Sequence, residues 1–339
     1  MALPPAKPIR EVAGVDRARF DAEIRPARQP VVLRGLCQGW PAVEAGRTSA
    51  EAAVAYLKRF GHPDPVPAIL GTPEIKGRFF YTPDLKALNF QRGQSPLIPF
   101  LDRLLRDQAN PAPHAMAVQS IPLPELLPGF VEENCIDLVD ANVIPRIWLG
   151  NAIQVATHYD LMENVGIVIA GRRRFTVFPP EQIANLYSGP FELTPAGTPV
   201  SLVDIHDPDL ARFPKFAEAM ETAQSALLEP GDAIYLPFHW WHAVDSLDAV
   251  NAFVNYWWNP ARPGLGSPYE ALMFALMSLR GLPDDQKDVW RMLFDHYVFQ
   301  DNGDPAAHLA PDVQGVLGPI TPARIGRMRA TLIDALGRK

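Results

Sequence analysis

The sequence is poor in cysteine and has no long hydrophobic run. Its 339 residues include two cysteines, Cys37 and Cys135, which lie far apart and form no Cys-x-x-Cys pair, so it shows neither a disulfide framework nor a thiolate metal cluster. The longest apolar run, residues 271–279, is shorter than the ~18 residues that a membrane span needs. The N-terminus also lacks the apolar core of a signal peptide. We therefore expect a cytoplasmic protein without a membrane segment.

The sequence also has no excess of positive charge. Its formal net charge is −7, which gives no built-in attraction for phosphate backbones, so we expect no nucleic-acid partner. It contains no phosphate-binding glycine loop and no Gly-x-Ser-x-Gly motif, so nucleotide-binding and hydrolase functions have no support. Hydrophobic residues make up 47% of the chain, which is enough for a sizeable core.

The pattern of the sequence changes twice along the chain. Residues 1–142 mix helix and strand, and residues 62–75 look like a loop because four prolines interrupt them. Residues 143–262 are short strand-like runs separated by turn signals, which is typical of a β-sandwich or barrel. Residues 263–339 return to helix. The expected helices cover 15–24, 49–61, 95–108, 121–134, 267–281, 284–300 and 321–339, and an early strand covers 30–36.

The strongest local signal for chemistry is a His-x-Asp motif formed by His158 and Asp160. Residues i and i+2 of a strand point to the same side, so the imidazole and the carboxylate converge. One further histidine would complete the two-histidine, one-carboxylate face that holds Fe(II) and leaves positions open. A second His-x-Asp, at residues 62–64, contains a proline and lies in the expected loop, so we do not favour it.

Several later histidines can supply the third ligand. His206 lies in a polar loop, and the segment Leu-Pro-Phe-His-Trp-Trp-His-Ala-Val at 236–244 is a better source because it contains a strand-like run after a turn. On a regular strand His239 and His242 face opposite sides, so only one can point inward. The residues alone favour His242, which stands within the apolar stretch, but leave His239 open. The other two candidates, on a helix and in a proline-rich connection, are His296 and His308.

These motifs, in this order, resemble a known family. Residues 143–260 are similar to the cupin-like JmjC group of Fe(II)- and 2-oxoglutarate-dependent oxygenases, and especially to its asparaginyl hydroxylases. The matching positions are Trp148, Gly150, His158, Asp160, Asn164, Gly171 to Phe175, Pro230-Gly231-Asp232, Trp240-Trp241-His242 and Asn255-Tyr256-Trp257. The resemblance implies a mainly β fold with helical additions, a double-stranded β-helix (jelly roll, or cupin barrel), within one domain that spans 1–339. It selects His242 as the third metal ligand and leaves His239 facing away from the metal, packed against the outer layer of the fold.

The resemblance also implies a cosubstrate site. The family often uses a lysine to hold the far carboxylate of 2-oxoglutarate, and this chain has Arg173 there, which can grip a carboxylate through two parallel hydrogen bonds. Alternation along the strand places Arg173 on one face and Arg172 and Arg174 on the other. By the same resemblance, Asn164, Asn255 and Tyr81 make further polar contacts with the cosubstrate. Trp257 forms part of the wall of the substrate pocket. Val155 stands where the family has a threonine.

Together these features predict a 2-oxoglutarate-dependent dioxygenase. We expect it to use Fe(II), 2-oxoglutarate and O₂ to hydroxylate a C–H bond of an amino-acid side chain in a protein or peptide, or of a small molecule. The alternative is a non-catalytic metal-binding cupin that acts as a sensor or scaffold. The helices at 267–281 and 284–300 are unusually apolar, and family members dimerise through C-terminal helices, so we expect a homodimer.

Overall fold

The computed structural model describes residues 3–61, 63–260 and 265–337. The chain divides into two compact units, residues 1–259 and residues 260–339. The single domain expected from the sequence stays a prediction. The rejected His-x-Asp motif begins at residue 62, which lies outside the described residues.

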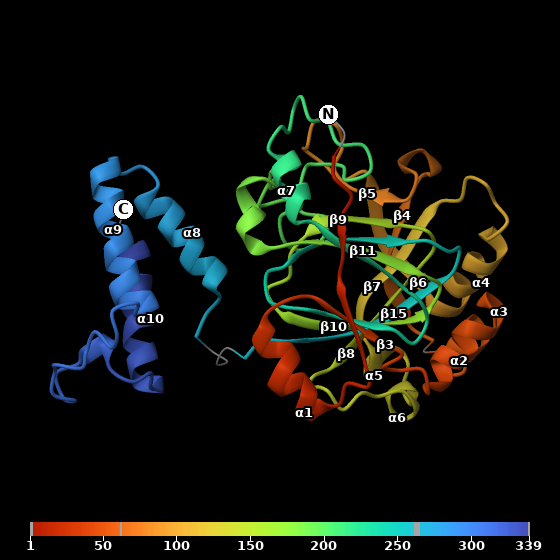
Figure 1. The fold of residues 1–339 in the computed structure, drawn as a ribbon, viewed down its shortest axis with the longest axis horizontal. Helices are drawn as coiled ribbons and strands as arrows, with labels where there is room; N and C mark the ends of the chain where they lie inside the picture. Colours follow the sequence, from red (N-terminus) through yellow and green to blue (C-terminus); the bar gives the residue numbers. More distant parts are fainter. Residues whose placement is uncertain (1–2, 62, 261–264, 338–339) are drawn as a thin grey trace. The chain divides into compact units, whose positions relative to one another are not determined.

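The first unit is built on two β-sheets (Figure 1). The smaller sheet has the strand order β1-β12-β11-β14-β9-β5 and the larger one β2-β3-β13-β10-β15-β8-β7-β4-β6. The strands are β1 Lys7–Pro8, β2 Arg10–Ala13, β3 Val31–Arg34, β4 Pro65–Gly71, β5 Arg78–Phe79, β6 Phe90–Pro96, β7 Ala115–Pro122, β8 Pro145–Gly150, β9 Gln154–His158, β10 Glu163–Ala170, β11 Arg173–Phe178, β12 Gln224–Leu228, β13 Ala233–Leu236, β14 Trp241–Ser246 and β15 Asn251–Trp258.

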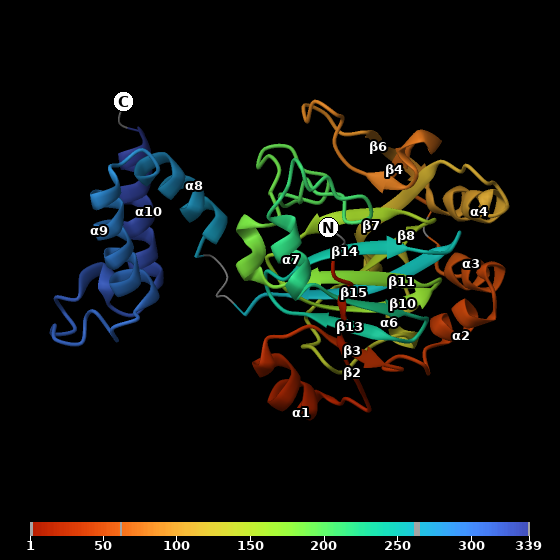
Figure 2. The ribbon, with the colours of Figure 1, turned by 45° about the horizontal axis from the view of Figure 1, so that its top comes forward.

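The strands β8 to β15 form the centre of both sheets. Four of them run β13-β10-β15-β8 in one sheet and four run β12-β11-β14-β9 in the other, with antiparallel pairing throughout. The chain passes repeatedly between the two layers, which Figure 2 shows from a second side. This is the jelly-roll arrangement of a double-stranded β-helix, so the predicted fold class is confirmed.

The N-terminal strands extend these layers, and one of them corrects a sequence prediction. The expected loop at 62–75 contains β4, which pairs with β6 over its whole length but with β7 only from Ala68 onward. Pro65 and Pro67 lie in the part of β4 that has no partner on its β7 side. A proline there removes no bond of the sheet, which is why it is tolerated in this strand.

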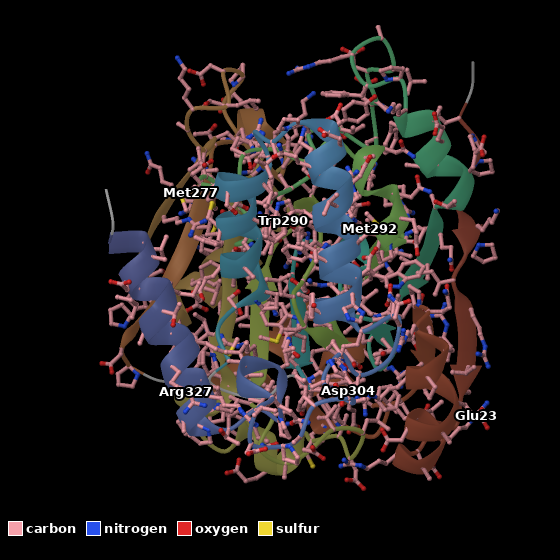
Figure 3. All side chains as sticks on the ribbon, turned by 90° about the vertical axis from the view of Figure 1, so that its left-hand side faces the viewer. Glu23, Met277, Trp290, Met292, Asp304 and Arg327 are labelled. Atoms are coloured by element: carbon pink, nitrogen blue, oxygen red, sulfur yellow. The ribbon has the colours of Figure 1, made fainter. Side chains whose placement is uncertain are left out.

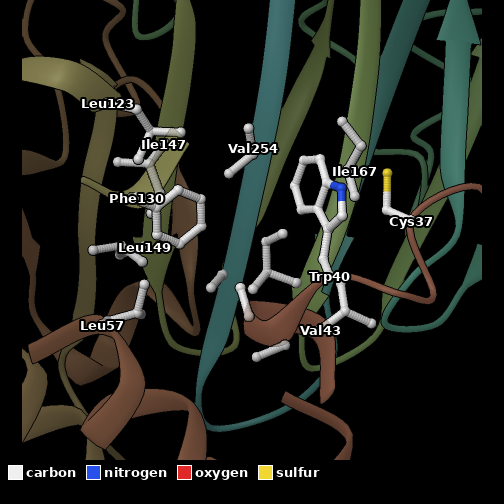
Figure 4. Packing of buried hydrophobic residues seen from close by; sticks show 14 of the residues in the cluster. Cys37, Trp40, Val43, Leu57, Leu123, Phe130, Ile147, Leu149, Ile167 and Val254 are labelled. Carbon is white, nitrogen blue, oxygen red and sulfur yellow. The ribbon is translucent and has the colours of Figure 1, made fainter. Parts of the chain in front are cut away.

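Helices cover the outer face of the larger sheet. They are α1 Arg17–Arg19, continued by helical turns to Ala27, α2 Pro41–Thr48, α3 Ala50–Lys58, α4 Leu97–Asp107, α5 Leu123–Leu126 and α6 Phe130–Glu133, while α7 Phe216–Thr222 contacts β11. Figure 4 shows Leu57 of α3, Phe130 of α6 and Trp40, which precedes α2, packed on the sheet beside Ile147 and Val254. This packing confirms the helices expected at 15–24, 49–61 and 95–108, whereas the segment expected at 121–134 begins in β7 and forms two separate helices, α5 and α6.

The inner faces of the two sheets enclose a second apolar cluster. Val168, Phe175, Val244 and Phe253 lie in it, with Trp148 packed at its margin. Gly166 on β10 leaves room for the Phe253 ring, because a Cβ atom at Gly166 would lie 2.1 Å from Cζ of Phe253. The cluster fills the interior, so polar side chains on these inner faces lie in a largely dry space.

The second unit consists of helices α8 Pro268–Leu279, α9 Asp284–Phe294 and α10 Pro322–Gly337, which confirms the three helices expected there. Ser267 caps α8 in a capping box with Glu270. None of the described residues of these helices is buried, and Figure 3 labels Met277, Trp290 and Met292 on them. Among the described residues, no helix has the length and hydropathy of a membrane span.

Candidate metal centre

The site lies where the last residue of β9, His158, meets the second residue of β14, His242. His158 and His242 are direct partners in the antiparallel register, whereas the next pair joins Val155 to Val244. β9 therefore advances by three residues where β14 advances by two. This bulge allows Val155 and His158 both to reach the interior, which regular alternation does not permit.

Three potential ligand atoms meet at this point. One atom each from His158, Asp160 and His242 lies within 4.8 Å of the other two, and Nε2 of His242 is 3.7 Å from Oδ2 of Asp160. The two imidazole centroids are 4.3 Å apart. His158 and His242 are buried and Asp160 is half-buried. The structure thus brings together the three residues that the sequence singled out, in a group that can hold a metal ion.

Both histidines are held in the same tautomer. Nδ1 of His158 lies 2.9 Å from the carbonyl oxygen of Ala156, and Nδ1 of His242 lies 3.0 Å from that of Trp240. A carbonyl oxygen only accepts hydrogen bonds, so each neutral ring must donate from Nδ1. Nε2 of each ring is then left with a free lone pair, as a metal ligand requires.

Burial keeps the His158 ring uncharged. Loss of solvation, with the nearby His242 ring acting in the same direction, lowers the pKa of His158 below its ordinary value, and the Asp160 carboxylate opposes this shift only in part. A neutral imidazole at ordinary pH is the form that binds a metal. The site therefore does not need to lose a proton from His158 before binding.

The backbone at His239 differs from the regular strand that the sequence argument assumed. It precedes β14 and has a φ of 66°, so it does not share a regular strand with His242, and that step of the sequence argument is wrong. Its backbone N–H donates to the carbonyl oxygen of Asp160 at 3.1 Å. Its ring stacks on Tyr159, with centroids 4.1 Å apart and planes 9° apart. His239 thus packs against the segment that carries the ligands and is outside the group of ligand atoms.

The two asparagines of the motif link the centre to Trp148. Asn164 donates from Nδ2 to Oδ2 of Asp160 at 3.4 Å, and Asn255 donates from Nδ2 to Oδ1 of Asn164 at 3.2 Å. Trp148 donates from its indole nitrogen to Oδ1 of Asn255 at 2.7 Å. Asn164 and Asn255 therefore lie beside the centre, and a continuous chain of hydrogen bonds orders their amides, while their contact with the cosubstrate stays a prediction.

Arg173 lies on an inner face, four residues along β11 from Val177, the register partner of His242. It is 6% exposed, whereas Arg174 is exposed and Arg172 pairs with Asp248 at the surface, as alternation predicted. Its guanidinium carbon is 4.6 Å from the centroid of the Phe253 ring. Burial lowers the pKa of Arg173 to about 9, so it still carries its charge at neutral pH.

The Arg173 charge has no acidic partner in the part of the chain that the structure describes, and its buried Nε atom has no hydrogen-bond partner there either. A buried unpaired cation is costly, which favours an anionic ligand in the interior. The four-residue step from the centre to Arg173 spans roughly 13 Å of strand. A dicarboxylate bound at the centre, together with the long arginine side chain, suits that separation.

The remaining candidates are placed less directly. The hydroxyl of Tyr81 donates to the carbonyl oxygen of Leu193 at 2.9 Å and so is engaged with a loop, although it was expected to reach the cosubstrate. Trp257 is half-buried and lies edge-to-face with Trp148 at 5.6 Å, and its indole N–H has no partner in the described residues. Val155 packs against the inner apolar cluster, and His206 pairs with Asp245.

Sequence reasoning missed the loop that borders the metal ligands. The backbone N–H of Ser201 donates to the carbonyl oxygen of Thr157 at 2.7 Å, and the hydroxyl of Thr198 donates to that of Tyr159 at 2.6 Å. These bonds lie on either side of His158 and hold the strand end in place. No local motif marks such a loop, because its contacts depend on the tertiary fold.

The comparisons with known proteins agree with this geometry. Residues 17–262 match the family described as cupin-like domain. The chain is 26% identical to lysine-specific demethylase 8 of Xenopus tropicalis over 68% of this chain and 48% of that protein. It is 25% identical to tRNA wybutosine-synthesizing protein 5 of Gallus gallus over 84% of this chain and 92% of that protein. A shorter match, 35% identical, is to HSPB1-associated protein 1 of Homo sapiens over 33% of this chain and 22% of that protein.

The chain spans about half the length of the demethylase and most of the length of the tRNA-modifying protein. The family match covers more than half of this chain and contains every residue of the candidate centre. The chain belongs to the family of cupin-like, JmjC-type domains.

Proposed function

We propose that this protein is an Fe(II)- and 2-oxoglutarate-dependent oxygenase. The observation that carries the proposal is the group of His158, Asp160 and His242 beside a buried, unpaired Arg173. Two neutral imidazoles and one carboxylate form the ligand set of non-haem Fe(II) oxygenases. The residues present therefore fit both the metal and the cosubstrate.

Each residue has a distinct task in this proposal. His158, Asp160 and His242 would hold Fe(II) from one side, and Arg173 would bind the far carboxylate of 2-oxoglutarate. When bound, these groups use O₂ to convert 2-oxoglutarate into succinate and CO₂ and to insert the second oxygen atom into a substrate C–H bond. The protein contributes ligand geometry, a fixed tautomer for each histidine and an interior that excludes water.

The substrate that we propose is an amino-acid side chain in a protein or peptide, with a small molecule as the second choice. The names of the relatives refer to lysine demethylation and to a tRNA modification. Demethylation of an amine also begins with hydroxylation of a C–H bond, so the proposal covers both outcomes. The net charge of −7 disfavours a tRNA substrate for this chain. We keep the cytoplasm as the proposed compartment.

The alternative is a metal-binding cupin without turnover. Two departures from the family pattern, Val155 and Arg173, motivate it, although the burial of Arg173 itself favours the oxygenase. Val155 lacks a hydroxyl, so one hydrogen bond to the cosubstrate must be absent or come from another residue. A cupin of this kind would bind a metal ion but would not bind 2-oxoglutarate.

The test combines turnover with a binding signal. Purified protein with Fe(II), 2-oxoglutarate and ascorbate is expected to form succinate, and His158→Ala is expected to abolish it. His308→Ala, at an exposed position of the second unit, is the matched control and should keep the activity. Under anaerobic conditions, 2-oxoglutarate should produce an iron absorption band. If iron binds but no band appears, the oxygenase proposal fails and the metal-binding alternative stands.

A further inference from the structure

Trp148 stands at one end of a hydrogen-bond chain whose other end is a proposed metal ligand. The chain runs from the indole N–H of Trp148 through Asn255 and Asn164 to Asp160, with donor–acceptor distances of 2.7, 3.2 and 3.4 Å. Asn255 is 1% exposed and Asn164 is 7% exposed. Water has little access to these amides, so each amide must find its hydrogen-bond partners among the other members of this hydrogen-bond chain.

The chemistry of the two ends sets the direction of every bond between them. An indole N–H can only donate, and an ionised carboxylate can only accept. Asn255 must therefore turn its oxygen to Trp148 and its NH₂ group to Asn164. Asn164 must in turn present its oxygen to Asn255 and its NH₂ group to Asp160. A flip of either amide would place two donors or two acceptors face to face.

We infer that Trp148 is a positioning residue for the metal-binding carboxylate. Its indole N–H orients both amides, so that Asn164 donates to the same oxygen of Asp160 that lies 3.7 Å from Nε2 of His242. This bond fixes the carboxylate on the side of the histidines. Hydrogen bonds to metal ligands raise affinity by holding the ligands in the binding geometry. The inference rests on the proposed metal-binding role of Asp160.

The neighbouring Trp257 supplies a matched control. Its ring lies edge-to-face with Trp148, with planes 84° apart, yet its buried indole N–H has no partner in the described residues. Changing either tryptophan to phenylalanine removes an N–H group and part of a ring from the same aromatic pair. The change at Trp148 alone removes a hydrogen bond.

The experiment measures binding of Mn(II) to the full chain by electron paramagnetic resonance, without turnover. Trp148→Phe is expected to weaken binding by about tenfold, the low end of the effect of losing an outer hydrogen bond to a ligand. Trp257→Phe should leave the Mn(II) affinity within about twofold. If Trp148→Phe does not fold, replacement of Trp148 by 3-benzothienylalanine keeps the shape of the ring system and removes the N–H group.

A double-mutant cycle decides whether Trp148 acts through the amides. Asn164→Ala breaks the chain at its last bond, so Trp148→Phe should weaken Mn(II) binding no further in that background. Additive losses would overturn the inference and leave Trp148 as a packing residue. Equal affinities of Trp148→Phe and the wild type would also overturn it. Failure of the wild type to bind Mn(II) would instead count against the proposed function itself.

Discussion

At the scale of the residue, each histidine of the candidate centre uses one ring nitrogen to bond its own backbone. His158 and His242 both donate from Nδ1 to the carbonyl oxygen two residues earlier. The bond depends only on the extended backbone and on ring orientation, so it forms without a further side chain. As a result, the free Nε2 atoms are aimed before any metal arrives, which lowers the cost of ordering the ligands on binding.

A comparison of two histidine variants tests this assignment. His242→Ala is expected to abolish binding of Fe(II), because it removes one of three proposed ligands. His239→Ala should preserve binding, because the contact of His239 with Asp160 is made by its backbone N–H. Histidine and alanine both carry a Cβ atom at the φ of 66°, so the modest loss of thermal stability that we expect comes from the lost stacking on Tyr159.

Anaerobic titration with Fe(II) gives the affinities, and His239→Gly is the control that relieves the backbone strain. Loss of binding in His239→Ala together with normal binding in His242→Ala would show that the assignment of the third ligand is wrong.

The sequence was informative here because the ligand motif is local. His158 and Asp160 are two residues apart, so their convergence was predicted from strand geometry, although β9 ends at His158 and Asp160 follows it. The choice between His239 and His242 could not be derived from strand geometry, because His239 lies in a turn with positive φ that strand alternation does not describe. The chain of hydrogen bonds from Trp148 to Asp160 could not be predicted from the sequence either. It joins residues of β8, β10 and β15, and only the fold defines the register of these strands.

At the scale of the element, close packing between strands shapes the part of the interior that we propose to bind the cosubstrate. β10 and β15 are neighbours, and Gly166 on β10 lies opposite Asn255 on β15. The ring of Phe253 fills the space that a side chain at position 166 would occupy, and the Arg173 guanidinium lies over this ring. The strands themselves were predictable from their apolar runs and turn signals. β4 was not, because whether a proline is tolerated depends on which edge of the strand is paired.

Gly166→Ala tests this packing. The new Cβ atom would lie 2.1 Å from Cζ of Phe253, so the ring must move from beneath Arg173. Overpacking of this kind is expected to lower the free energy of unfolding by about 1–3 kcal/mol, and we also expect weaker binding of 2-oxoglutarate. Gly93→Ala on β6 is the matched control, because a Cβ atom there meets nothing within 4 Å.

Urea unfolding measures the stability of both glycine variants, and 2-oxoglutarate titration of the Mn(II)-loaded protein measures binding. Equal stability of the two variants would contradict the packing argument. A destabilised Gly166→Ala protein with unchanged 2-oxoglutarate affinity would show that the position of the Phe253 ring does not affect cosubstrate binding.

At the scale of the whole molecule, the second unit exposes more apolar surface than a free helical unit is expected to show. Met277, Met292 and Phe299 are 67%, 61% and 65% exposed, and a groove of about 530 Å³ lies among side chains of α8, α9 and the turn that follows. Large contiguous apolar surfaces on soluble proteins mark interaction sites. We propose that these helices join two copies of the chain into a homodimer.

Charged substitutions on this surface test the proposal in the full chain. Met277→Glu combined with Met292→Glu is expected to convert the dimer to a monomer, because burying two carboxylates in an apolar interface costs several kcal/mol. Arg327→Glu, at an exposed polar position of α10, is the charge-matched control and should stay dimeric. Light scattering gives the mass in each case, and truncation at residue 265 should also give a monomer. A double variant or a truncated chain that stays dimeric would place the interface outside this unit, whereas a monomeric wild type would leave its apolar surface for a different partner.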